Sequence, residues 1–335
     1  MVHIIFLIAF IFALPLLNKK YSVYIFTFIT LFLFLALRYN YGNDYQSYLI
    51  LYKKLHYTND WDKELLYTFL NKLIPNYQLM LALISLFYIF VIYYLIKNNI
   101  DVMKYWQAIL LLLINPYLFL IHLSSLRQTI AMCFFIIAIG FLIKKKYIGF
   151  FLSIIVAAGF HVSAILLLPI VFISDRKLTK KKKIFIIILT TLVASTSLFE
   201  EILNEILKIF PKYRMYANYN YTNSLQSTII FCILFIIMLT NINKLEGKEI
   251  IYGKLALISI ILSILAVRLT MITRFNIYFE IFIIIAYPLI ISKVSNKIYR
   301  YSLFAFIVSV YLLKYISFFN NATFIDYYSS YHIIL

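Results

Sequence analysis

Long apolar runs that follow one another along the chain constrain the fold of this sequence more than any other feature. A helix needs about 20 apolar residues to cross the hydrocarbon core of a bilayer. Runs at or near that length lie at 2–17, 21–37, 77–96, 105–121, 128–143, 184–199, 228–242, 251–267, 276–292 and 301–318. One further run, 147–173, is interrupted by Gly159, Phe160 and His161. With 64% hydrophobic residues, the chain is predicted to be an all-α polytopic integral membrane protein with about 11 apolar segments.

The chain is expected to form one transmembrane domain over residues 1–335, because it has few glycines and prolines and no internal repeat. Two longer polar stretches, 38–76 and 200–227, separate the apolar runs. The first run has no basic leader and no small-residue cleavage site after it, so we interpret it as a retained span. Both cysteines lie inside apolar runs, so neither a disulfide framework nor a zinc site is expected.

Basic residues between the apolar runs predict how the chain is oriented. Lys and Arg are enriched in cytoplasmic loops, and they cluster here at 19–20, 97–104, 144–146, 176–183, 244–248 and 293–300. This assignment places the amino terminus, both polar loops and the carboxyl tail outside. Only the run 147–173 separates two clusters that should both be cytoplasmic. We therefore predict that this run is a broken or re-entrant helix pair that turns near His161. The net charge of +18 follows from this pattern, and no nucleic-acid partner is expected.

Ionisable residues gather near the outer membrane face under this topology. Inserting one such residue at membrane depth costs roughly 2.5–3.5 kcal/mol of free energy on insertion scales, so each is expected to have a structural or functional role. The group consists of Arg38, Asp44, Glu64, His122, Arg127, His161, Arg268, Arg274 and Glu280. This clustering predicts binding or chemistry at the outer face. It also argues against the function of an ion pump, because no charge pair lies near the middle of a span.

The positions of the arginines in the predicted helices differ. Arg38 and Arg268 follow helix ends, where a cation complements the helix dipole. Arg127 and Arg274 lie instead in a predicted first turn, where positive charge is unfavourable unless an anion binds there. That anion is either an interfacial lipid phosphate or a phosphate or diphosphate substrate.

Two candidates for proton transfer come from separate parts of the chain. His161 follows a glycine inside an apolar run, and a neutral imidazole there could donate a hydrogen bond or accept a proton. A buried, hydrogen-bonded structural histidine is the alternative. Glu64 lies in a predicted amphipathic interfacial helix that starts at Trp61 and ends at Pro75, with Trp61, Leu65, Phe69 and Leu73 on its apolar face. A second interfacial helix is predicted over 200–212.

No P-loop, HExxH, nucleophile elbow or Cys/His metal spacing occurs in the sequence. Short motifs do resemble those of one family in the right order. The segment from Arg38 to Tyr48, with Gly42 and Asp44, resembles the R…G-x-D-x-x-x-Y opening of the EpsG-like branch of the Wzy-type polysaccharide polymerases. Residues 126–131 (LRQTIA) match its L-R-Q-x-I-A signature, and 160–164 (FHVSA) match F-H-x-S-A. Glu64 resembles the acidic residue of the family's motif in the first outer loop, although the usual E-P-G-Y reads E-L-L-Y at residues 64–67 here. Arg274 with Tyr278 resembles a later R-x-x-x-Y-F element.

The resemblance implies a function at the outer leaflet of the bacterial cytoplasmic membrane. Such enzymes polymerise oligosaccharide repeat units carried on undecaprenyl diphosphate, which is released as the growing glycan moves to the acceptor unit. For this chain it implies a glycosyltransferase-type reaction with no cofactor and no metal. Expected partners are the lipid-linked oligosaccharide as donor and acceptor, the lipid bilayer, and in addition a chain-length regulator and a flippase.

The resemblance also suggests roles for individual residues. His161 or Glu64 is expected to accept the proton of the acceptor hydroxyl. The diphosphate-binding candidates are Arg127, Arg274 and Arg38, and the sugar- or loop-binding candidates are Asp44, Gln128 and Tyr278. Three rival functions stay open: a secondary transporter or flippase of lipid-linked sugars, a membrane O-acetyltransferase, and an O-antigen ligase. A transporter would be expected to show repeat symmetry and charges at the bilayer midplane.

Overall fold

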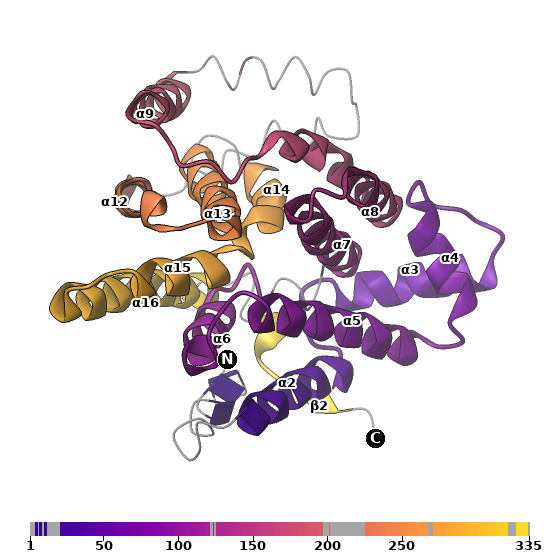
Figure 1. Ribbon diagram of the computed structural model, residues 1–335. Coiled ribbons are helices and arrows are strands. Elements are labelled where there is room, and N and C mark those ends of the chain that lie inside the picture. The colour runs from indigo at the N-terminus through magenta and orange to yellow at the C-terminus, as the bar shows by residue number, and fades with distance from the viewer. Residues whose placement is uncertain are drawn as a thin grey trace. The chain divides into compact units, whose positions relative to one another are not determined.

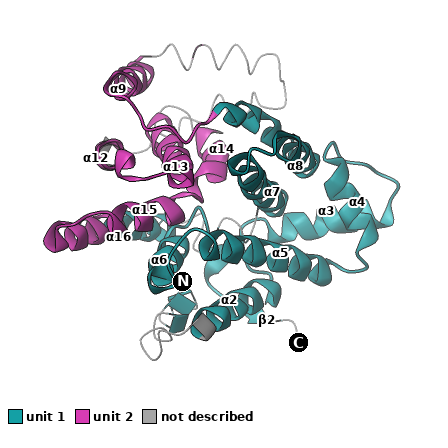
Figure 2. Ribbon diagram, in the orientation of Figure 1, with its two compact units in different colours: residues 1–172, 308–335 teal, residues 173–307 magenta. Residues whose placement is uncertain are grey.

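The computed structural model describes residues 21–333 except 121–122, 124, 197–200, 202–224, 267–270 and 321–325, together with residues 4, 5, 7, 8, 10 and 11. The described chain groups into two compact units, 1–172 with 308–335 and 173–307 (Figure 2). Some of the residues singled out from the sequence lie outside the described residues: His122, Arg268, most of the run 2–17 and nearly all of the loop 200–227.

The first unit contains the amino-terminal helices and the carboxyl-terminal segment (Figure 1). Its elements are α2 (Tyr21–Ala36), β1 (Arg38–Tyr39), α3 (Tyr45–Tyr57), α4 (Leu65–Leu73), α5 (Tyr77–Lys97), η1 (Val102–Lys104), α6 (Tyr105–Ile114), α7 (Leu126–Ile143), α8 (Tyr147–Phe160), η3 (Val162–Phe172), η6 (Asp326–Tyr328) and β2 (His332–Ile333). The two short strands pair antiparallel, with Arg38 opposite Ile333. The carboxyl-terminal segment is thereby attached to the first polar loop.

The second unit is also helical. It contains α9 (Lys180–Ser195), α12 (Leu225–Asn241), η5 (Ile242–Lys244), α13 (Lys248–Leu265), α14 (Met271–Glu280) and α15 (Ile283–Ser292). The boundary between the units falls within α16 (Lys297–Asn320). Helix α13 packs against α12, α14 and α15. The hydroxyl of Ser263 in α13 accepts a hydrogen bond from the Asn276 amide of α14 at 3.0 Å, which joins two apolar helices through a buried polar contact.

Three described helices, α5, α7 and α16, are long and apolar enough to cross a membrane. The pair α14 and α15 passes the same test as a broken span, bent by 50°. Together with the shorter apolar helices, this shows an all-α, multi-pass membrane protein. The predicted number of eleven apolar segments is not confirmed. One predicted run, 105–121, ends early as a helix at Ile114, because Asn115 precedes a proline and adopts an extended backbone.

The run 147–173 is broken at the predicted place. Helix α8 ends at Phe160, His161 has an extended backbone (φ −151°, ψ 110°), and the 3-10 helix η3 begins at Val162. Helices α8 and η3 contact each other, and both contact α7. Whether this pair enters and leaves the bilayer on one side stays a prediction.

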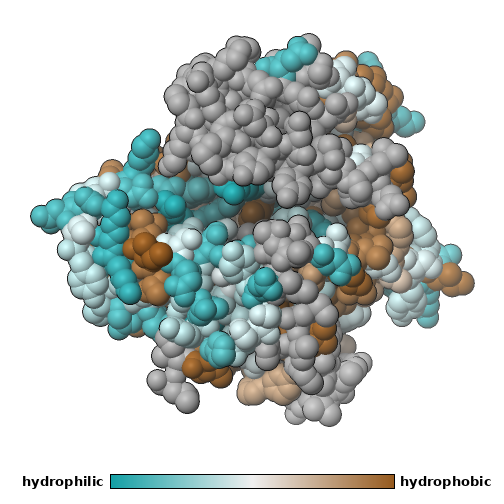
Figure 3. All heavy atoms as spheres, turned by 180° about the vertical axis from the view of Figure 1, so that it is seen from behind, coloured by the Kyte–Doolittle hydropathy of each residue, from teal (hydrophilic) through white to brown (hydrophobic). Residues whose placement is uncertain are grey.

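Many large apolar side chains are exposed, as expected for a surface that faces lipid. On α5, Leu83, Leu86 and Phe90 follow one another on one exposed face, while Met80, Ile84 and Tyr88 are buried. Figure 3 shows hydrophobic residues exposed beside hydrophilic ones on one face of the molecule. The arrangement is typical of helices that have both protein and lipid neighbours.

Candidate active site

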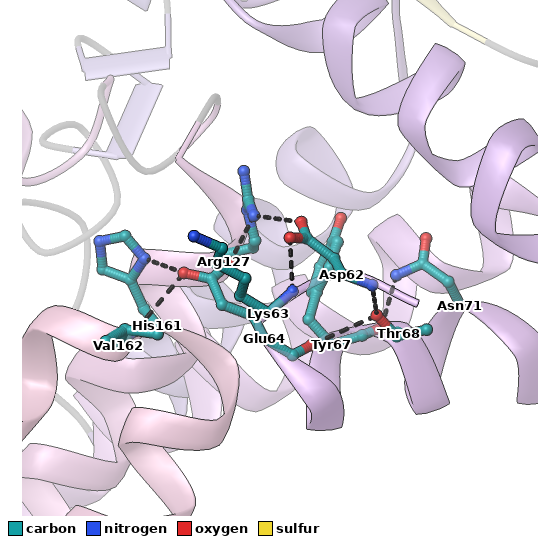
Figure 4. Close-up of polar contacts among 9 residues, drawn as sticks. All are labelled: Asp62, Lys63, Glu64, Tyr67, Thr68, Asn71, Arg127, His161 and Val162. Carbon is teal, nitrogen blue, oxygen red and sulfur yellow. Dashed lines mark hydrogen bonds and ion pairs between the residues drawn. The ribbon is translucent and has the colours of Figure 1, made fainter. Parts of the chain in front are cut away.

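Three residues predicted from the sequence meet in the first unit. His161 Nδ1 lies 2.7 Å from Glu64 Oε1, and Arg127 Nη1 donates to Glu64 Oε2 at 2.5 Å (Figure 4). Arg127 Nη1 also donates to Asp62 Oδ2 at 2.9 Å. Glu64 is buried, whereas Arg127 and His161 retain partial exposure, at 28% and 32% of their side chains. The cluster therefore has a buried centre and an accessible rim.

Each member of the cluster sits at the end of a helix. Glu64 occupies the N-cap position of α4, Arg127 lies in the first turn of α7, and His161 follows the last residue of α8. Helix α8 contacts both α4 and α7, which brings the three ends together. The packing of α8 against α4 and α7 therefore positions all three side chains.

A glycine allows α4 to approach α8 closely. A Cβ atom at Gly159 would lie 2.6 Å from Leu66 Cδ1 and 2.7 Å from Leu66 Cγ, closer than real side chains pack. Leu66 follows Glu64 by two residues, and Gly159 precedes His161 by two. The small residue at 159 therefore lets the backbone segments that hold the Glu64–His161 hydrogen bond come together.

The hydrogen bond to Glu64 determines which nitrogen of His161 is available. An ionised carboxylate can only accept hydrogen bonds, so Nδ1 must carry a proton. The Val162 amide also donates to Glu64 Oε1, at 3.4 Å, and supports the same acceptor role. In the neutral imidazole, Nε2 then has a free lone pair and can accept a proton. The tautomer is inferred from this hydrogen-bond pattern.

Asp62 belongs to an irregular segment before α4. Its backbone N–H donates to Thr68 Oγ1 at 3.1 Å, and its carboxylate accepts from the Lys63 N–H at 2.6 Å. Helix α4 begins at Leu65 and not at Trp61 as predicted, because Asp62 and Glu64 turn toward Arg127 instead of entering the helix. Because α4 begins only at Leu65, the carboxylates of Asp62 and Glu64 both contact the guanidinium of Arg127.

Two tyrosines cover the guanidinium of Arg127. Its Cζ lies 5.8 Å from the ring centre of Tyr48 and 5.7 Å from that of Tyr67, within the range of cation–π attraction. Burial raises the pKa of Tyr48, and Arg127 only partly opposes this shift. Burial also raises the pKa of Tyr67 well above its ordinary value. Both phenols are therefore neutral at physiological pH, and Arg127 is balanced by the carboxylates.

The anion expected at the first turn of α7 is present, but the protein itself supplies it. Ser125 is the N-cap and makes no side-chain capping bond, so the carboxylates of Asp62 and Glu64 are the charges that face Arg127 in this turn. Two carboxylates facing one cation leave the local charge slightly negative while His161 is neutral. A bound phosphate would therefore have to compete with Asp62 or Glu64 for Nη1.

Arg38 has a different environment from the one expected for a diphosphate ligand. It is 2% exposed, and its Nη1 and Nη2 donate to the carbonyls of Leu35 at 2.6 Å and Leu123 at 2.7 Å. Burial lowers the pKa of Arg38, although a guanidinium stays charged in proteins. Leu123 lies just before α7, so Arg38 connects the end of α2 with the segment that leads to Arg127.

The carboxyl-terminal segment covers the same region. Tyr328 donates to the Leu120 carbonyl at 3.0 Å, and Tyr331 donates to the Phe34 carbonyl at 2.6 Å. Gly42, at φ +114°, has a backbone that favours glycine, and its N–H donates to the Tyr327 carbonyl at 3.2 Å. The glycine of the predicted opening motif thus shapes the loop that receives the carboxyl-terminal segment.

The remaining predicted site residues lie at the start of α3, in α7 and in α14. Asp44 is exposed at the start of α3, where a carboxylate complements the helix dipole. Gln128 is buried next to Arg127 in α7. Arg274 is exposed and Tyr278 is buried, both on α14 of the second unit. Glu280, from the wider group of ionisable residues, is buried at the end of α14.

Within the described part of the chain, no three His, Cys, Asp or Glu side chains converge as metal ligands would. A reaction without metal or cofactor stays a prediction. Sequence reasoning missed Asp62 as a member of the cluster. The only signal for it was its position two residues before Glu64, and that spacing alone does not bring two carboxylates to one arginine.

Comparison with known proteins gives one result. The model of the EpsG family matches residues 21–332, nearly the whole chain. Neither the curated proteins nor the solved structures contain a match. The matched range includes every residue of the cluster.

Proposed function

Because the chain belongs to the EpsG family, which suggests a Wzy-type polymerase of polysaccharide biosynthesis, we propose that it joins undecaprenyl-diphosphate-linked oligosaccharide repeat units. The reaction would take place at the outer leaflet of the cytoplasmic membrane. The observation that carries this proposal is the Glu64–His161 hydrogen bond beside Arg127, since it combines a possible base with a cation.

In the proposed reaction, the acceptor hydroxyl attacks the anomeric carbon of the donor glycan. The bond between that carbon and the diphosphate oxygen breaks, and undecaprenyl diphosphate leaves with the electron pair. His161 Nε2 takes the hydroxyl proton and later releases it to water. Glu64 holds the imidazole in the required tautomer and stabilises the imidazolium that forms, as a positioning residue.

Arg127 would offset the negative charge that develops on the leaving diphosphate. Its two carboxylate partners differ in how firmly they are held. Glu64 is buried and also bound to His161 and Val162, whereas Asp62 lies on an irregular, partly exposed segment. Asp62 is therefore the partner that a diphosphate would displace.

The chain length of the surface polysaccharide tests the proposal. A deletion strain should make single repeat units, wild-type protein should restore polymer, and Arg127→Ala at equal protein level should not. Arg176→Ala, which changes an exposed arginine in the loop before α9, is the matched control and should restore polymer.

Two outcomes would favour a rival function. Lipid-linked repeats trapped on the cytoplasmic side of the deletion strain would indicate a flippase. Polymer of normal length without acetyl groups would indicate an O-acetyltransferase. Normal polymer with Arg127→Ala would contradict the proposed role of Arg127.

A further inference from the structure

Helix α4 has the reverse of the polarity expected for a helix in water. Its buried face includes polar groups, Thr68 and Asn71, and the N-cap residue Glu64 is buried as well. Its exposed face is apolar: Leu65, Phe69 and Leu73 recur every fourth residue and, together with Trp61 of the preceding segment, are 56% to 65% exposed. We call these four residues the apolar face of α4. A soluble helix buries its apolar stripe and exposes its polar one.

The reversed pattern indicates the medium that surrounds α4. Four large apolar side chains side by side would be costly in water, whereas Thr68 and the Asn71 amide N–H on the buried face make hydrogen bonds. The Asn71 amide donates to the Tyr67 carbonyl at 2.6 Å, and Thr68 Oγ1 accepts from Asp62. Such an inversion is typical of a helix whose outer side lies against lipid.

The position of α4 in the chain places it close to the membrane surface. Only residues 74–76 separate its end from α5, which is long and apolar enough to span the bilayer. Fully extended, the four steps from Leu73 to Tyr77 reach at most about 14 Å. Helix α4 therefore lies within reach of the bilayer boundary at the Tyr77 end of α5.

Charge at the rim of the apolar face agrees with this location. Lys72 Nζ lies 4.7 Å from the ring centre of Trp61, and Lys63 is exposed nearby in the sequence. Tryptophan at the headgroup level with lysines beside it is the pattern found where proteins meet a lipid–water interface.

We propose that the apolar face of α4 binds the bilayer interface, and that this contact holds Glu64 in place in the active site. Glu64 is the N-cap of α4, and Leu66 fits against Gly159, two residues before His161. Movement of α4 away from the bilayer would move Glu64 relative to His161. The second half of this proposal, the effect on catalysis, rests on the proposed function, whereas the lipid contact does not.

Trp61 provides a direct probe. The chain has two tryptophans, so Trp106→Phe leaves Trp61 as the only one. The full-length variant would be reconstituted into vesicles of phosphatidylcholine and phosphatidylglycerol without any lipid-linked sugar. Lipids brominated near the glycerol backbone should quench most of the Trp61 emission, lipids brominated near the chain ends should quench less, and aqueous iodide should quench little.

Two further variants of the same single-tryptophan protein complete the test. Changing Leu65, Phe69 and Leu73 together to Gln should shift quenching from brominated lipid to iodide, and changing them together to Met should not. Quenching of the parent by iodide but not by brominated lipid would overturn the lipid contact. Protection of Trp61 from both quenchers would overturn it too, because a protein segment would then cover the face.

Polymer formation separates the two halves of the proposal. If the Gln variant loses brominated-lipid quenching and polymer, while the Met variant keeps both, the contact with lipid holds the site together. If the Gln variant loses the quenching but makes normal polymer, the coupling to Glu64 is wrong. A deletion strain with normal polysaccharide would instead refute the proposed function, and the quenching result would be unaffected.

Discussion

Arg127 and Arg38 were both expected to bind the diphosphate, but their surroundings in the structure differ. Arg127 is partly exposed, faces two carboxylates and lies near two tyrosine rings. Arg38 is buried and donates to two backbone carbonyls beneath the carboxyl-terminal segment. A cation that binds a substrate must be reachable and able to exchange partners, and only Arg127 meets both conditions.

A buried arginine can support a neighbouring site through bonds to the backbone alone. By bonding to the Leu123 carbonyl, Arg38 fixes the chain just before the helix that carries Arg127. We therefore expect Arg38 to act mainly on stability and Arg127 mainly on the reaction.

Arg127→Ala should abolish function with little loss of protein. Removal of one hydrogen-bond donor that stabilises developing negative charge costs about 10²–10³ in rate, so the initial rate of polymer formation should fall at least about 100-fold. The thermal midpoint of the purified protein should fall less than in Arg38→Met. An equal or greater fall would break the comparison, because Arg127 would then be mainly structural.

Arg38→Met should act mainly on stability. The substitution leaves the Leu35 and Leu123 carbonyls without their donors, at about 1–3 kcal/mol for each unsatisfied buried group. We expect a lower thermal midpoint and less protein in the membrane. Polymer formation per molecule of folded protein should stay within a few-fold of wild type, and a loss as large as that of Arg127→Ala would mean that Arg38 also contacts the substrate.

Gly159→Ala should produce an intermediate effect on the rate of polymer formation. The added methyl group would overlap Leu66 and push α4 away from α8, which should lengthen the Glu64–His161 contact. We expect a reduced rate of polymer formation together with a loss of about 1–3 kcal/mol in unfolding free energy from overpacking. Gly140→Ala is the matched control, because a Cβ at Gly140 meets no atom within 4 Å.

Tyr331→Phe should have the smallest effect. It removes one hydrogen bond to the Phe34 carbonyl, for a net loss of about 0.5–1.5 kcal/mol in unfolding free energy. Tyr48→Phe is the counterpart in the Arg127 region: it removes the hydroxyl that interacts with the Arg127 side chain and should lower the rate of polymer formation rather than the stability. If Tyr331→Phe slowed polymer formation more than Tyr48→Phe, the two regions would not be separable.

Much of the fold and of the candidate site was predictable because local sequence patterns indicate it. The apolar runs indicated a helical membrane protein, Gly159 and His161 marked the break after α8, and charge patterning gathered Glu64, Arg127 and His161 on one side. The pairing of β1 with β2 and the approach of Asp62 to Arg127 were not predictable, because each joins distant residues through backbone or loop geometry. The burial of Arg38 was missed for the same reason, since its partners are carbonyl groups that every residue has.

A double-mutant cycle on Glu64 and His161 tests whether Glu64 orients His161 as the base of the reaction. The measurement is the initial rate of polymer formation by protein reconstituted with an undecaprenyl-diphosphate-linked repeat unit, for Glu64→Gln, His161→Asn and the double variant. If Glu64 acts by orienting the base His161, the double variant should be no slower than His161→Asn alone, since residues that act as a unit are not additive. If the two losses multiply instead, Glu64 and His161 act independently, and the proposed base and its positioning residue are wrong.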